Sequence, residues 1–219
     1  MSHRTRIKIC GLTREADVDA AVEAGADAVG FVLYDKSPRF VTLARAVELA
    51  KRLPPFVMPV GLFVNAGEPE IDAACVAIPQ LLLQFHGDET PAQCARAARP
   101  FLRAARVAPG FDLLDFATRF AHAQAILLDA HVEGYGGGGK VFDWSLVQSA
   151  VPLPLVLSGG LHAGNVAHGI HALRPWAVDV SSGVESAQSP KRGIKDADAI
   201  RRFCDAVREA DARADASTA

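Results

Sequence analysis

The sequence predicts an α/β fold, a single-domain (β/α)8 TIM barrel that takes in residues 1–219. Short runs rich in β-branched residues alternate with longer segments whose apolar residues recur at helical spacing, which is typical of strand-helix units around a parallel sheet. Eight such units in 219 residues leave roughly 27 residues for each, close to the least that a strand, a helix and two loops require. The even repetition favours a closed barrel over the alternative, an open doubly wound sheet. The strand-like runs are residues 6–11, 28–33, 58–64, 81–87, 102–107, 125–130, 154–159 and 177–182.

Helical segments follow seven of these runs, and helix start signals precede several of them. We expect helices to begin near Thr13, Thr42, Glu68 and Thr90, because threonine side chains cap free backbone N–H groups. The predicted helices are residues 14–24, 43–53, 69–76, 91–99, 112–122, 162–172 and 196–208.

The unit after the sixth strand departs from this pattern. It contains a glycine-rich loop at residues 134–139 and then a short helical segment at 144–149. Read with Lys140, the loop approximates a nucleotide-binding P-loop, but Val141 occupies the place of the hydroxyl residue that would hold magnesium. We interpret it as a mobile loop that covers a substrate, with a plain flexible loop as the alternative.

The composition describes a globular chain without an obvious macromolecular partner. Half of the residues are apolar, 22% are charged and the net charge is −2, so we expect neither disorder nor binding to nucleic acid. No secretory leader or membrane-spanning run is evident, and the four cysteines are dispersed, which predicts a cytoplasmic protein without membrane contact. The tail after Asp211 is rich in alanine, aspartate and serine, and we expect it to be frayed.

Candidate chemical groups are those at the carboxyl ends of the strands, where barrels of this type place their active sites. Cys10 ends the first strand, Asp129 ends the sixth, and Gln84 and His86 share one face of the fourth. The other cysteines fall inside predicted helices and are expected to pack there. The histidines of the 162–172 helix have no cysteine or carboxylate at ligand spacing, so no metal site is predicted.

Two glycine-containing loops predict a phosphate site. Gly159 and Gly160 follow the seventh strand, and Ser182 and Gly183 follow the eighth. Phosphates in such barrels lie after these two strands, where backbone N–H groups at a helix start can approach an anion. The alternative is that the glycines only make tight turns.

A buried ion pair is predicted where the barrel closes. Lys8 and Asp179 share the inward parity of Cys10, and the first and last strands of a closed barrel are neighbours. Alternatively, Lys8 favours the Cys10 thiolate, and Asp179 contacts a sugar hydroxyl.

A set of motifs, in this order and spacing, resembles the phosphoribosylanthranilate isomerase family along residues 8–196. The resemblance implies the Amadori rearrangement of N-(5'-phosphoribosyl)anthranilate to 1-(2-carboxyphenylamino)-1-deoxyribulose 5-phosphate in tryptophan biosynthesis, with no cofactor. The motifs are KICGLT (8–13), SPR (37–39), VGLFVN (60–65), QFHG (84–87), GKVFDW (139–144), LSGGL (157–161) and VDVSSGVE (178–185).

By the same resemblance, Cys10 is the general base, Asp129 is the general acid, and Arg39 and His86 line the anthranilate side of the pocket. The guanidinium of Arg39 can bind a carboxylate bidentately. The implied partner is a small phosphorylated molecule, and we expect a monomer or a weak homodimer. The alternatives are another phosphosugar barrel enzyme, whose metal-binding histidines or Lys and Glu set we do not find, or a sugar-phosphate-binding module without catalysis.

Overall fold

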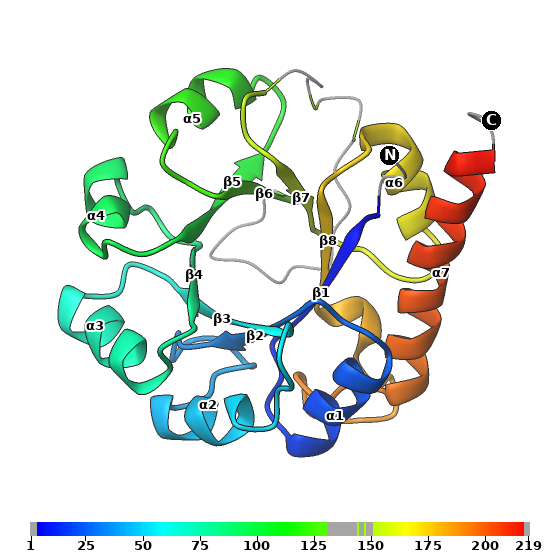
Figure 1. The fold of residues 1–219 in the computed structure, drawn as a ribbon, viewed down its shortest axis with the longest axis horizontal. Helices are drawn as coiled ribbons and strands as arrows, with labels where there is room; N and C mark the ends of the chain where they lie inside the picture. The colour runs from blue at the N-terminus through cyan, green and yellow to red at the C-terminus, as the bar shows by residue number, and fades with distance from the viewer. Residues whose placement is uncertain (1–3, 131–143, 145–146, 148–150, 217–219) are drawn as a thin grey trace.

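Eight parallel strands close into a barrel in sequence order, with β8 hydrogen-bonded back to β1 (Figure 1). The computed structural model describes residues 4–130, 144, 147 and 151–216. The closed order confirms the predicted (β/α)8 barrel and rules out the open sheet. The strands are β1 (Arg6–Cys10), β2 (Ala28–Val32), β3 (Met58–Phe63), β4 (Leu82–Phe85), β5 (Phe101–Val107), β6 (Ala125–Ala130), β7 (Leu155–Leu157) and β8 (Ala177–Val180).

Helices surround the barrel, and the last of them, α7, lies against α1 and α6 (Figure 1). Two predicted start signals are confirmed: Thr42 accepts a hydrogen bond from the backbone N–H of Arg45, and Thr90 accepts one from Gln93. The helices are α1 (Glu15–Glu23), α2 (Leu43–Ala50), α3 (Glu68–Ala77), α4 (Pro91–Arg96), α5 (Leu113–Arg119), α6 (Val166–Leu173) and α7 (Ala197–Ala216), and a 3-10 turn, η2 (Ser182–Val184), follows β8.

The other two signals lie where helices begin, but neither side chain caps its helix. The hydroxyl of Thr13 donates to the carbonyl oxygen of Gly193 (3.2 Å), so it caps no helix, and α1 begins after Arg14. Glu68 is already the first residue of α3, which follows Gly67.

Side-chain contacts move two further helix ends. Helix α6 begins at Val166 rather than at residue 162, because the side chain of Asn165 accepts from the N–H of His162 (2.8 Å) and holds a turn before the helix. Helix α7 continues to Ala216, where composition predicted fraying after Asp211. The Asp211 carboxylate accepts hydrogen bonds from the backbone N–H and the hydroxyl of Thr5 (2.8 and 2.7 Å). These bonds attach α7 to the residue that directly precedes β1.

Apolar side chains fill the barrel interior near the amino ends of the strands, whereas polar side chains lie at the carboxyl ends. The interior cluster comes from the first halves of the strands and includes Val60, Leu102, Leu127, Val156 and Ala177. A larger cluster packs the outer faces of the strands against the helices. Polar side chains at the carboxyl ends of the strands therefore face a space with an apolar floor.

Some predictions fall on residues outside this description. The glycine-rich loop 134–139, Lys140 and most of the predicted helix 144–149 belong to them. Of the helices that the structure describes, none has the length and apolar character needed to cross a bilayer.

Candidate active site

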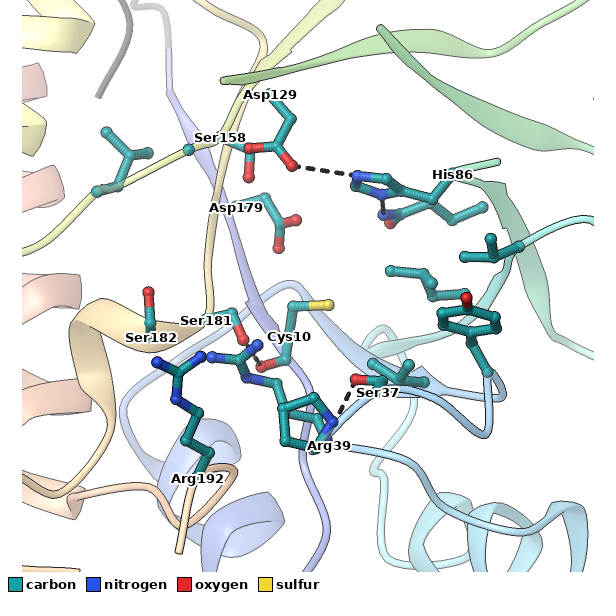
Figure 2. Close-up of a pocket in the computed structure, with 18 of the residues that line it drawn as sticks. Cys10, Ser37, Arg39, His86, Asp129, Ser158, Asp179, Ser181, Ser182 and Arg192 are labelled. Atoms are coloured by element: carbon teal, nitrogen blue, oxygen red, sulfur yellow. Dashed lines mark hydrogen bonds and ion pairs between the residues drawn. The ribbon is translucent and has the colours of Figure 1, made fainter. Parts of the chain in front are cut away.

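A cavity of about 250 Å³ opens at the carboxyl end of the barrel. Its walls include Cys10 from β1, Arg39 from the segment after β2, His86 directly after β4, Asp129 from β6 and Asp179 from β8 (Figure 2). The structure thus brings together all four of the side chains proposed for catalysis and anthranilate binding. In Figure 2, Asp179 lies between Cys10 and Asp129.

Cys10 is buried at the edge of this cavity, with 5% of its surface exposed. Neighbouring Gly30 makes room for the thiol, since a Cβ there would lie 2.7 Å from Sγ of Cys10. Burial raises the pKa of the Cys10 thiol; the charge of Lys8 lowers it, but not enough to offset burial and the nearby Asp179. In the free protein the group is therefore a thiol at neutral pH: Lys8 favours the thiolate, as the alternative expected, but burial and Asp179 outweigh it.

Lys8 and Asp179 form the predicted ion pair where the barrel closes. Their Nζ and Oδ1 atoms are 2.9 Å apart, their side chains are 5% and 6% exposed, and the two residues are direct partners in the register of β1 and β8. Burial lowers the pKa of Lys8, but the combined effect of Asp179 and Cys10 is larger and raises it. Lys8 therefore remains charged.

Asp129 belongs to a buried row of three polar side chains. Its Oδ2 lies 3.1 Å from Nε2 of His86, and Nδ1 of His86 lies 3.1 Å from Nε2 of Gln84 (Figure 2). All three residues are at most 8% exposed. The row connects the ends of β4 and β6 across the cavity.

Arg39 is held by charges that follow β8. Its Nε donates to Oε1 of Glu185 (2.6 Å), and Nζ of Lys195 lies 3.3 Å from the same oxygen and donates to the carbonyl oxygen of Ser181 (2.9 Å). Burial lowers the pKa of Lys195 to about 8; Arg39 adds to this effect, while Glu185 and Cys10 oppose it. Glu185 therefore fixes the direction of the guanidinium at the wall of the cavity.

The sequence patterns did not predict the support that Glu185 and Lys195 give to Arg39. Glu185 and Lys195 lie in a stretch without regular pattern after the eighth strand, and Arg192 of the same stretch lines the cavity near Ser182 (Figure 2). The available signal was three charged residues within a loop that follows a barrel strand, at the end where the site was expected.

The two loops predicted to bind phosphate both open into this cavity. Gly159, Gly160 and Ser182 line it, so the prediction that these loops open beside Cys10 and Asp129 is confirmed. Gly160 does not open directly into a helix, since α6 begins only at Val166. Gly183 has a packing role, because a Cβ there would overlap the carbonyl oxygen of Leu161 and separate the two loops.

The histidines near α6 have local roles. The ring of His168 stands edge-on against Trp144, with 5.1 Å between centroids, and Nδ1 of His162 accepts from the N–H of Gly164. Among the described residues, no three His, Cys, Asp or Glu side chains gather as metal ligands would.

A family model described as N-(5'phosphoribosyl)anthranilate (PRA) isomerase matches residues 7–206. The chain belongs to the phosphoribosylanthranilate isomerase family. This membership favours the isomerase over the other phosphosugar barrels considered above.

Individual members of the isomerase family resemble this chain over nearly its full length. The N-(5'-phosphoribosyl)anthranilate isomerase of Methylibium petroleiphilum is 75% identical over 214 residues, which cover 98% of this chain and 99% of that relative. The crystal structure of phosphoribosyl anthranilate isomerase from Thermotoga maritima has a TM-score of 0.83 at 40% identity, with 94% of this chain and 99% of that one covered. A further phosphoribosyl anthranilate isomerase structure, in complex with reduced 1-(o-carboxyphenylamino)-1-deoxyribulose 5-phosphate, has a TM-score of 0.78 at 36% identity and covers 94% and 99% of the two chains.

Proposed function

We propose that this chain, an isomerase of tryptophan biosynthesis, rearranges N-(5'-phosphoribosyl)anthranilate with Asp129 as general acid and Cys10 as general base. The observation that carries the proposal is that these two side chains, from β6 and β1, line one cavity with an apolar floor. Acid and base on different strands can act on different atoms of one bound aminosugar.

The first step is opening of the ribose ring. Asp129 gives its proton to the ring oxygen, the bond between that oxygen and C1' breaks, and the lone pair of the anilino nitrogen forms the C1'=N bond of a Schiff base. Oδ2 of Asp129 lies 3.1 Å from His86, which can stabilise the carboxylate that remains.

The second step is removal of the proton at C2'. The Cys10 sulfur takes this proton, the C2'–H electrons form a C1'=C2' bond, and the positive nitrogen recovers its lone pair, which gives an enolamine. The enolamine becomes the ketone when its hydroxyl loses a proton and C1' gains one. Because the resting group is a thiol, its proton must first pass to an acceptor, and transfer of this one proton from Cys10 to Asp129 supplies both the thiolate base and the protonated acid. The Lys8 ammonium lowers the free energy of the thiolate.

Substrate binding is assigned to charged and backbone groups around this pair. Arg39, oriented by Glu185, binds the anthranilate carboxylate, and His86 lies on the same side of the cavity. The phosphate is bound by two loops, one with Gly159 and Gly160 and the other with Ser182. Gly183 allows these two loops to pack against each other. Competition by inorganic phosphate against the substrate tests the second assignment.

We further infer that the chain works in the cytoplasm as a monomer or a weak homodimer. A Thermotoga maritima structure, 35% identical, is described as mutually generated monomers of a dimeric phosphoribosylanthranilate isomerase. Sedimentation velocity over a range of concentrations measures the state of this chain, and a tight dimer at nanomolar concentration would contradict the proposal.

The catalytic assignments are tested by turnover, followed as the loss of substrate fluorescence. Positioned acid or base catalysis is worth ~10²–10⁴-fold, so Asp129→Asn and Cys10→Ala should each lower kcat by that factor while KM changes far less. Cys10→Ser should resemble Cys10→Ala, because a hydroxyl is a poorer proton acceptor. Cys94→Ala is the matched control, since this buried thiol lies in α4, away from the cavity, and should leave kcat unchanged.

Near-normal kcat in Cys10→Ser would make Cys10 a packing residue and refute its role as the base. Binding of the substrate without any turnover by the unaltered protein would instead support the sugar-phosphate-binding module.

A further inference from the structure

One buried amide of the cavity wall has no part in the chemistry above. Gln84 is 0% exposed on β4, and the residue that precedes it on the same inward face is Leu82, which packs on the apolar interior cluster. Its Oε1 meets no hydrogen-bond partner among the residues that the structure describes. An unpaired buried oxygen is unfavourable compared with an apolar side chain of the same shape, so packing alone does not account for a glutamine here.

The contact with Gln84 decides which nitrogen of His86 carries a proton. In a neutral imidazole one ring nitrogen donates and the other accepts, and an amide nitrogen only donates. Nε2 of Gln84 lies 3.1 Å from Nδ1 of His86, and in this orientation of the amide Nδ1 accepts, which assigns the ring proton to Nε2. That Nε2 then donates to Oδ2 of Asp129, 3.1 Å away.

We propose that Gln84 is a positioning residue for the acid step, which holds His86 as the Nε2–H tautomer and thereby keeps a neutral donor on the Asp129 carboxylate. The inference rests on the proposed role of Asp129 as general acid. Because His86 donates to Oδ2, the transferable proton is left to Oδ1. When Asp129 has given that proton away, the donor already aimed at Oδ2 stabilises the new negative charge without rearrangement.

The first test is Gln84→Met, which keeps the length of the side chain and removes the amide. Loss of one neutral hydrogen bond should lower kcat about three- to tenfold, with KM within about twofold of its original value. The nitrogen-15 NMR spectrum of labelled protein reports the tautomer directly. In the unaltered protein we expect a protonated Nε2 and an unprotonated Nδ1 at His86, and in Gln84→Met a mixture of the two tautomers.

Gln84→Glu tests the same contact in the opposite sense. A carboxylate only accepts, so Nδ1 of His86 should become protonated, and kcat should fall at least as far as in Gln84→Met. Leu82→Ala is the control, because it removes side-chain volume from the same inward face without touching His86, and it should change neither kcat nor the tautomer.

Three results would overturn the inference: a proton on Nδ1 of His86 in the unaltered protein, an unchanged kcat in Gln84→Met, or an equal loss in Leu82→Ala. The spectrum of the unaltered protein decides even where a variant fails to fold. Asp129→Asn separates this inference from the proposed function. If it retains turnover, the acid assignment fails, whereas turnover lost in Asp129→Asn but kept in both Gln84 variants refutes only the role of Gln84.

Discussion

The ion pair between Lys8 and Asp179 predicts a large and non-additive loss of stability when either partner is removed. At the 2.9 Å that separates the charged atoms, their attraction is about 6 kcal/mol for an effective dielectric constant of about 20. Removing both ions from water costs a comparable amount, so the intact pair adds little net stability. Loss of one partner leaves the other charge buried, with 4% or 5% of its residue exposed, and should cost about 3–5 kcal/mol.

The assay is urea unfolding of Lys8→Met, Asp179→Asn and the double variant, with thermal unfolding as a second measurement. For a chain of this length the single variants should lower Tm by roughly 6–20 °C. The double variant should lose much less than the sum of the two, because it leaves no unpaired charge. Stability is the appropriate readout here, since both residues are close to Cys10 and turnover would mix several effects.

Arg52 and Asp19 supply the control, because they form an ion pair of similar length, 2.6 Å, with side chains 42% and 40% exposed. Arg52→Met should cost less than about 1 kcal/mol. If Lys8→Met costs no more than this control, or if the losses from Lys8 and Asp179 simply add, the argument from an unpaired buried charge is wrong.

Two further predictions concern substrate binding and pH. Arg39→Lys removes the planar guanidinium and its bond to Glu185. Loss of a charged hydrogen bond to the substrate should raise KM about 10- to 100-fold, with a smaller change in kcat. An unchanged KM in steady-state kinetics would contradict the role of Arg39. In the productive form, the Cys10 and Asp129 side chains together hold a single proton. When that proton is lost at high pH, no acid remains to open the ring, and kcat/KM falls. Because burial raises the pKa of the thiol, this fall should occur above the ordinary pKa of cysteine, and a fall near neutral pH in a kcat/KM profile would refute the assignment.

Local sequence patterns determined the barrel and the position of its site. The alternation of strand and helix patterns predicted eight units, and because all strands of such a barrel are parallel, every strand end faces the same way. Cys10 and Asp129 could therefore be placed in one cavity although they are far apart in the chain. The parity of Lys8 and Asp179 on neighbouring strands predicted their contact for the same reason.

Contacts between distant segments decided what these patterns could not. The extension of α7 depends on the bond between Asp211 and Thr5, which are 206 residues apart. The protonation state of the Cys10 thiol is another case, because it depends on how completely the folded chain excludes water.

The orientation of Arg39 likewise required the tertiary structure. Glu185 and Lys195 reach it from a stretch without helical or strand periodicity, so no repeat pattern marks them as neighbours of the segment after β2. A periodic pattern reports which face of a local element is buried, and so the sequence determined the elements and the strand ends. Burial, the pKa values and the partners of charged side chains depend on atoms brought together only by the closed barrel, and these the tertiary structure decided.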